Sequence, residues 1–130
     1  MKRNRRKKES VILSVVLGIY CLNRFYLKTI GVSGFVGYVL RCHFNDFLGG
    51  ICILAYFSLV FSYSRYDKID FTRPFNALVI TFCCGVFWEF IFPHIFHHGT
   101  SDTLDLLAYS FGGLFYSTIH ISLKKGNRGA

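Results

Sequence analysis

The chain has 130 residues, enough for one domain, and its hydrophobic fraction of 52% is more than a soluble domain of this length could cover with polar sequence. Fifteen Lys and Arg against seven Asp and Glu give a net charge of +8, but six of the basic residues lie in the first eight positions. A nucleic-acid-binding protein needs basic residues spread over a folded face, so this distribution argues against a nucleic-acid partner and favours a protein anchored in a lipid bilayer.

The first two predicted elements are a basic tail and a transmembrane helix. Residues 1–9 are predicted to form a cytoplasmic tail, and residues 10–30 the first helix, although its last third carries Asn23, Arg24 and Lys28. A basic start before an apolar run also resembles a signal peptide, but no small-x-small cleavage site follows, so we expect the helix to be retained. Residues 31–44 are apolar, short and contain three glycines, which predicts a re-entrant or interfacial segment.

Three further apolar stretches are long enough to span a bilayer. They cover residues 45–63, 75–92 and 104–123, and the third predicted helix is opened by Pro74 and closed by Pro93. Residues 126–130 complete the chain as a second short cytoplasmic tail. The sequence therefore predicts an all-α fold, an integral membrane four-helix bundle over residues 10–125.

The orientation of this bundle follows from its basic residues. Twelve of the fifteen lie in the terminal segments and in the loop between the second and third helices, which leaves Arg24, Lys28 and Arg41 toward the other side. Cytoplasmic segments carry an excess of Lys and Arg. Both termini are therefore predicted to be cytoplasmic.

With this topology, four carboxylates reach one level of the membrane on the outer side. Asp46 opens the second helix, Glu89 lies one turn before the outer end of the third, and Asp102 and Asp105 open the fourth. His43 falls in the same layer. Tyr109 follows Asp105 at helical spacing, so the two share one face of the fourth helix.

Small residues follow the acids along the same helix faces. Asp46 shares its face with Gly49 and Gly50, and Glu89 shares its face with Gly85. Small residues allow the backbones of membrane helices to approach closely. We expect these faces to meet and the acids to form a shared, outward-facing cup.

Ionisable groups inside a membrane are costly and usually functional. The candidate catalytic residues are therefore Glu89, Asp105 and Asp46. The candidate ligand-binding residues are Asn45, Asp102, Tyr109 and Arg24. Structural alternatives remain open: a salt bridge between Glu89 and Arg24, and helix caps formed by Asn45-Asp46, Asp102 and Asp105.

Histidines beside these acids suggest a metal. His94, His97 and His98 stand at i, i+3 and i+4, and His97 and His98 are the candidate ligands of a divalent metal such as zinc or manganese. The alternative is a wet interfacial loop, because Pro93 and Gly99 disfavour a shared helical face. No other cofactor is predicted, and His120 is interpreted as a packing residue.

The sequence from Trp88-Glu89-Phe90 through residues 100–109 to Phe111-Gly112-Gly113 resembles the VanZ-like membrane proteins. Those proteins pair a helix-borne glutamate with a downstream aspartate that begins the next helix, followed by a glycine pair. The chain is similar as well to small bacterial proteins labelled magnesium-citrate secondary transporters, in which an Asn-Asp pair opens the second helix as Asn45-Asp46 does here. The resemblance covers roughly residues 41–115, and the arginine common in the family's last outer loop is absent.

The resemblance implies a multi-pass protein of the bacterial cytoplasmic membrane, linked to the cell envelope and in some relatives to glycopeptide (teicoplanin) resistance. We favour a cup in which Glu89 and Asp105 bind, or do acid/base work on, a cationic or hydroxyl-bearing group of a lipid head group or cell-wall precursor. One alternative is a homo-oligomeric secondary transporter for a cation or metal–citrate complex. Another is a non-catalytic partner of a second membrane protein. No GxSxG, HExxH or P-loop motif supports familiar hydrolase chemistry, so whether the protein is an enzyme stays open.

Overall fold

The computed structural model describes residues 2–27, 29–31, 33–64, 69–97 and 102–126, and all the regular structure within them is helical. The four long helices are α1 (Lys2–Leu22), α3 (Phe44–Tyr63), α4 (Pro74–Val86) and α6 (Thr103–Gly126). Two short helices, α2 (Gly34–Cys42) and α5 (Phe92–Phe96), and two π-helical segments, η1 (Asn23–Leu27) and η2 (Phe87–Ile91), extend or connect them. The predicted all-α class is confirmed.

Within the described residues, four helical stretches are long and apolar enough to cross a membrane. They are Lys2–Tyr26, Phe44–Tyr63, Pro74–Phe96 and Thr103–Gly126, so η1 continues α1, and η2 and α5 continue α4. Each has at least the length of about 20 residues that the hydrocarbon core requires. This agrees with a multi-pass membrane protein.

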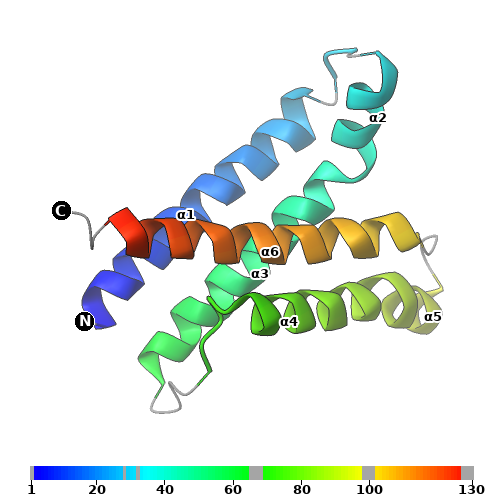
Figure 1. Ribbon diagram of the computed structural model, residues 1–130. Coiled ribbons are helices and arrows are strands. Elements are labelled where there is room, and N and C mark those ends of the chain that lie inside the picture. Colours follow the sequence, from blue (N-terminus) through cyan, green and yellow to red (C-terminus); the bar gives the residue numbers. More distant parts are fainter. Residues whose placement is uncertain (1, 28, 32, 65–68, 98–101, 127–130) are drawn as a thin grey trace.

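The long helices form two antiparallel pairs, α1 with α3 and α4 with α6, which cross each other (Figure 1). α3 and α6 are central, because α3 packs against both α1 and α6, and α6 packs against both α3 and α4. The start of α1 and the end of α6 lie at one end of the molecule, which we call the terminal end. The opposite end, where α2 joins α3 and where α6 begins, is called the α2 end.

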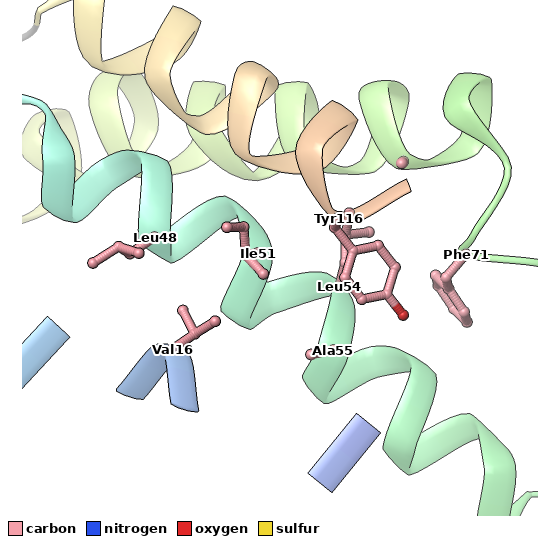
Figure 2. Close-up of a cluster of buried hydrophobic side chains, with 8 residues drawn as sticks. Val16, Leu48, Ile51, Leu54, Ala55, Phe71 and Tyr116 are labelled. Atoms are coloured by element: carbon pink, nitrogen blue, oxygen red, sulfur yellow. The ribbon is translucent and has the colours of Figure 1, made fainter. Parts of the chain in front are cut away.

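The apolar core follows one face of α3 (Figure 2). Leu48, Ile51, Leu54 and Ala55 recur every three or four residues along α3 and are at most 3% exposed. Val16 of α1 packs on one side of this face and Tyr116 of α6 on another. The core thus joins the two helix pairs across α3.

The outer surface is apolar, whereas several buried side chains are polar. Phe25, Phe35 and Phe75 are each at least 75% exposed, while Glu9 and Ser58 are fully buried. A continuous apolar exterior of this kind marks a surface that contacts lipid or another apolar partner. The distribution fits a chain that places its polar groups between helices and its aromatic side chains toward the bilayer.

Two predicted boundaries are wrong. The first helix, α1, begins at Lys2 rather than at residue 10, and Arg6 in its first part donates to the Ser62 carbonyl oxygen of α3 (2.8 Å). The third span does not end at Pro93 but runs to Phe96. The π-helical turn η2 ends two residues before this proline, and such π adjustments let a membrane helix pass a residue without an N–H.

Candidate functional site

The predicted acids meet at the α2 end. There the first turns of α3 and α6 lie near η2. Asp46 stands in the first turn of α3, Glu89 lies in η2, and Asp105 stands in the first turn of α6. We call the group at this place the acidic cluster; its members are Asp46, Glu89, Asp102, Asp105, Tyr109 and His43. Carboxylates up to 59 positions apart in the sequence are thereby brought into one site.

Glycines on α3 and α6 make this approach possible, as predicted. A Cβ built on Gly50 would lie 2.3 Å from the Tyr109 carbonyl oxygen, and one on Gly112 would lie 2.1 Å from the Phe47 carbonyl oxygen. Gly85 of α4 instead makes room for the Leu106 and Tyr109 side chains of α6. The helices therefore touch through their backbones directly below the acidic cluster.

Within the cluster, the contacts run from α2 to η2. His43 Nδ1 lies 2.5 Å from Asp105 Oδ1, and the other ring nitrogen, Nε2, lies 3.4 Å from the Tyr38 hydroxyl. The Asp46 carboxyl interacts with the side chains of both Asp105 and Tyr109. The Asp102 backbone N–H donates to Glu89 Oε2 (3.3 Å), which joins η2 to the start of α6.

The acidic cluster holds four carboxyl groups in partly buried positions, with few positive charges to balance them. The side chains of His43 and Asp105 are only 11% and 20% exposed, and Asp46 and Glu89 are partly buried. Among the described residues, no Lys or Arg forms an ion pair with any of the four carboxylates. Like charges in a medium of low dielectric repel strongly, so the site favours bound cations or protons.

Some sequence-predicted site residues lie elsewhere or have other partners. Arg24 is exposed on η1 and does not pair with Glu89, so the alternative of a salt bridge between them is wrong. His97 is exposed and stands in a left-handed conformation (φ 53°) after α5, and His98 lies outside the described residues. Among the described residues, the side chains that lie close enough to share a metal ion are His43, Asp102 and Asp105. They are not the histidines that the sequence predicted as ligands.

Asn45 has a structural partner that the sequence did not reveal. The fully buried Asn23 side chain donates to Asn45 Oδ1 (2.7 Å) and to the Leu40 carbonyl oxygen (3.1 Å). These two bonds connect η1 to α2 and α3 beside the acidic cluster. Asn45 thus positions α3 rather than capping it, because α3 begins one residue earlier, at Phe44.

Asp102 does cap its helix, as the structural alternative proposed. Its Oδ1 accepts the Leu104 backbone N–H (2.9 Å) immediately before α6 begins at Thr103. A carboxylate oxygen at this position satisfies one of the free N–H groups of the first turn. The cap also fixes the direction of the Asp102 side chain at the edge of the cluster.

A second polar group, absent from the sequence-predicted site, lies at the terminal end. Glu9 is fully buried and accepts hydrogen bonds from the Ser58 hydroxyl (3.0 Å) and the Tyr116 hydroxyl (2.9 Å). His120 Nε2 lies 3.3 Å from Glu9 Oε1, at ion-pair distance but without hydrogen-bond alignment, and Arg5 donates to the same Ser58 hydroxyl. We call these five residues the Glu9 cluster.

An apolar groove of about 380 Å³ opens beside the acidic cluster. Its wall comes from α2, α3 and α6 and includes His43, the residue that contacts Asp105. The other lining residues are Val39, Phe44, Phe47, Ala108 and Phe111. An apolar chain could lie in this groove with its polar end at the cluster.

Comparison of the chain with protein-family models, with curated proteins and with solved structures gives no match. Over the residues that the structure describes, the regular structure is helical, four helices are able to cross a membrane, and the acidic cluster lies at one end of them.

Proposed function

We propose that the protein is a VanZ-like multi-pass protein of the bacterial cytoplasmic membrane, whose acidic cluster engages the polar head of a lipid-borne envelope ligand. The observation that carries this proposal is the convergence of Asp46, Glu89 and Asp105 with His43, without a Lys or Arg partner among the described residues. Buried ionisable groups that serve only the fold are normally paired.

The neighbouring groove supports a ligand of lipid character. Its lining is apolar and aromatic, so it suits an alkyl or polyprenyl chain, and His43 belongs both to the groove and to the cluster. A ligand with its chain in the groove would place a cationic or hydroxyl-bearing head against Asp105. Pockets that combine an apolar wall with a few convergent polar groups are the usual form of a ligand site.

In the proposed orientation, with both termini in the cytoplasm, this site faces the outer side of the membrane. The proposal rests on the basic residues, which concentrate at the terminal end of the helices, and on the preference of Lys and Arg for the cytoplasmic face. Reporter tags at both ends of the chain should resist protease added outside intact cells. Tags on opposite sides of the membrane would contradict the proposed topology.

A genetic experiment tests the role of the cluster. The gene is disrupted in its bacterium, and sensitivity to teicoplanin and to detergent is measured after complementation with the wild type, Glu89→Gln or Asp105→Asn. Both variants should insert normally and fail to complement. Asp70→Asn, which changes an acid in the loop before α4, is the matched control and should complement. Full complementation by the cluster variants would refute the proposal.

A homo-oligomeric transporter of a cation or metal–citrate complex is the second candidate, and the Glu9 cluster is the observation that favours it. Polar side chains stand near both ends of α6, with the partly buried Asp105 at one end and the buried His120 at the other. However, the backbone contact of Gly50 with Gly112 closes the space between α3 and α6, so a path would need a second copy of the chain. Flux of Mg²⁺ or Mg²⁺–citrate into proteoliposomes would support transport, and its absence under ion gradients would exclude it.

A further inference from the structure

We infer that His43, Asp102 and Asp105 form a binding site for a divalent transition-metal ion such as Zn²⁺ or Mn²⁺. This deepens the proposed function: it rests on that proposal for the role of the metal, but the presence of the metal can be tested by itself. The three side chains each bring one ligand atom to a place where all the atoms lie within 4.8 Å of one another.

The spacing of these atoms is close to what a bound ion requires. Zinc binds nitrogen and oxygen ligands at about 2.0–2.2 Å, so neighbouring ligand atoms of a tetrahedral ion lie roughly 3.4 Å apart. In the structure the His43 Nδ1 to Asp105 Oδ1 distance is shorter, and every other pair in the group lies within 4.8 Å. Small side-chain rotations toward a common centre would equalise them.

His43 is held as metal-binding histidines commonly are. Its Nε2 lies 3.4 Å from the Tyr38 hydroxyl, and the two rings meet edge to face with centroids 5.3 Å apart. A metal on Nδ1 requires the proton on Nε2, and the Tyr38 oxygen is placed to accept it. Outer hydrogen bonds of this kind fix the tautomer and orientation of a ligating imidazole.

The donor set selects the class of ion. One imidazole with two carboxylates suits zinc, manganese or iron, whereas magnesium and calcium prefer oxygen ligands alone. A doubly charged ion would also offset the repulsion among the carboxylates, including Asp46, which interacts with Asp105. Three protein ligands leave a coordination position open, which an oxygen of the ligand's head group could occupy.

The experiment uses the full chain purified in detergent, stripped with a chelator, equilibrated with ZnCl2 or MnCl2, and analysed for bound metal after gel filtration. The wild type should retain about one ion per chain. His43→Ala and Asp105→Asn should lose it, and Tyr38→Phe should bind on the order of tenfold more weakly. Substoichiometric binding by the wild type would overturn the inference.

The control must exclude the other histidines near this end. A variant with His94, His97 and His98 all changed to alanine should keep its bound ion. If that variant loses the ion while His43→Ala retains it, the metal belongs to the loop after α5 and our site is refuted. If His43→Ala does not fold, the loop variant still decides, because its melting temperature should rise with metal and fall with chelator. No shift in that variant would count against the site.

Failure of this inference is distinguishable from failure of the proposed function. If the wild type binds no metal but Asp105→Asn fails to complement, the metal site is refuted and the proposed envelope function is retained. If the wild type binds one metal ion per chain and Asp105→Asn complements fully, the metal site is supported and the proposed envelope function is refuted.

Discussion

Glu9 and Asp105 are carboxylates in helices that could cross a membrane, yet their surroundings differ. Glu9 is fully buried, two hydroxyls donate to it, and His120 lies at ion-pair distance. Asp105 is partly exposed and shares its site with other acids and one imidazole. In the Glu9 cluster both carboxylate oxygens of Glu9 accept hydrogen bonds, although His120 Nε2 has no aligned partner, and a buried carboxylate paired in this way suits a structural role. The acidic cluster is unbalanced, which favours an external partner.

The largest effect should come from opening the Glu9 cluster. Glu9→Ala would leave the Tyr116 hydroxyl and His120 buried without their partner, and breaking a buried pair in this way costs about 3–5 kcal/mol. We expect a large fall in the melting temperature of the protein in detergent. Glu9→Gln keeps an acceptor oxygen for one of the two hydroxyls and nearly the same volume, so it should lower the melting temperature less than Glu9→Ala. A Glu9→Ala variant as stable as the wild type would remove the structural role.

The next effect concerns the backbone contact between the two clusters. Gly112→Ala would place a Cβ against the Phe47 carbonyl oxygen, and overpacking of this kind costs typically 1–3 kcal/mol. Gly18→Ala is the matched control, because nothing lies within 4 Å of the added Cβ. Thermal unfolding should therefore be easier for the first variant and unchanged or harder for the second. Equal effects would mean that α3 and α6 are not in close contact.

A smaller effect of opposite sign is expected within the acidic cluster. Asp46→Asn removes one of several like charges while preserving side-chain volume, so repulsion with Asp105 and Glu89 decreases. The metal-free variant should melt at a higher temperature than metal-free wild type. Destabilisation as large as that of Glu9→Ala would show that Asp46 has a structural partner and that the two clusters do not differ as described.

The smallest effect should come from the loop acid Asp70, which belongs to neither cluster. Burial alone would raise the pKa of Asp70, but hydrogen bonds from Thr72 and the charges of Lys124 and Arg73 outweigh it and lower that pKa. Its stabilising contribution is therefore complete above the unfolded-state pKa of about 3.9 and is lost as pH falls through the lower folded-state pKa. Asp70→Asn should melt slightly below the wild type at pH 7, and the difference should vanish in acid. A difference that grows in acid would contradict this sign.

Much of the acidic cluster could be predicted because its determinants are local. Helical spacing placed Asp105 and Tyr109 on one face, and the alternation of spans brought that face to the level of Asp46 and Glu89. The glycine contacts followed from the same faces. These inferences need only the period of a helix and the thickness of a bilayer.

The Glu9 cluster was missed because Glu9 stands in a basic run that resembles a solvated tail. A signal was present, however: Arg5, Glu9 and Val16 fall on one helical face, and Tyr116 and His120 are one turn apart on α6. The pairing of these two faces depends on how α1 leans on α3, which local sequence does not specify. Likewise, His43 could be placed in the outer layer, but its contact with Asp105 depends on the short turn between α2 and α3.

The most direct test of the account is whether the acidic cluster forms across the two helix pairs. In a chain whose five native cysteines are replaced, His43→Cys and Asp105→Cys are combined, and a protease site is inserted between α3 and α4. After mild oxidation in membranes and cleavage, we expect the two fragments to remain joined until a reductant is added. The control pair is Val11→Cys with Asp105→Cys, because Val11 lies beside Leu123, near the end of α6 opposite Asp105. Fragments that separate as readily as those of the control pair would contradict the convergence on which the proposed site depends.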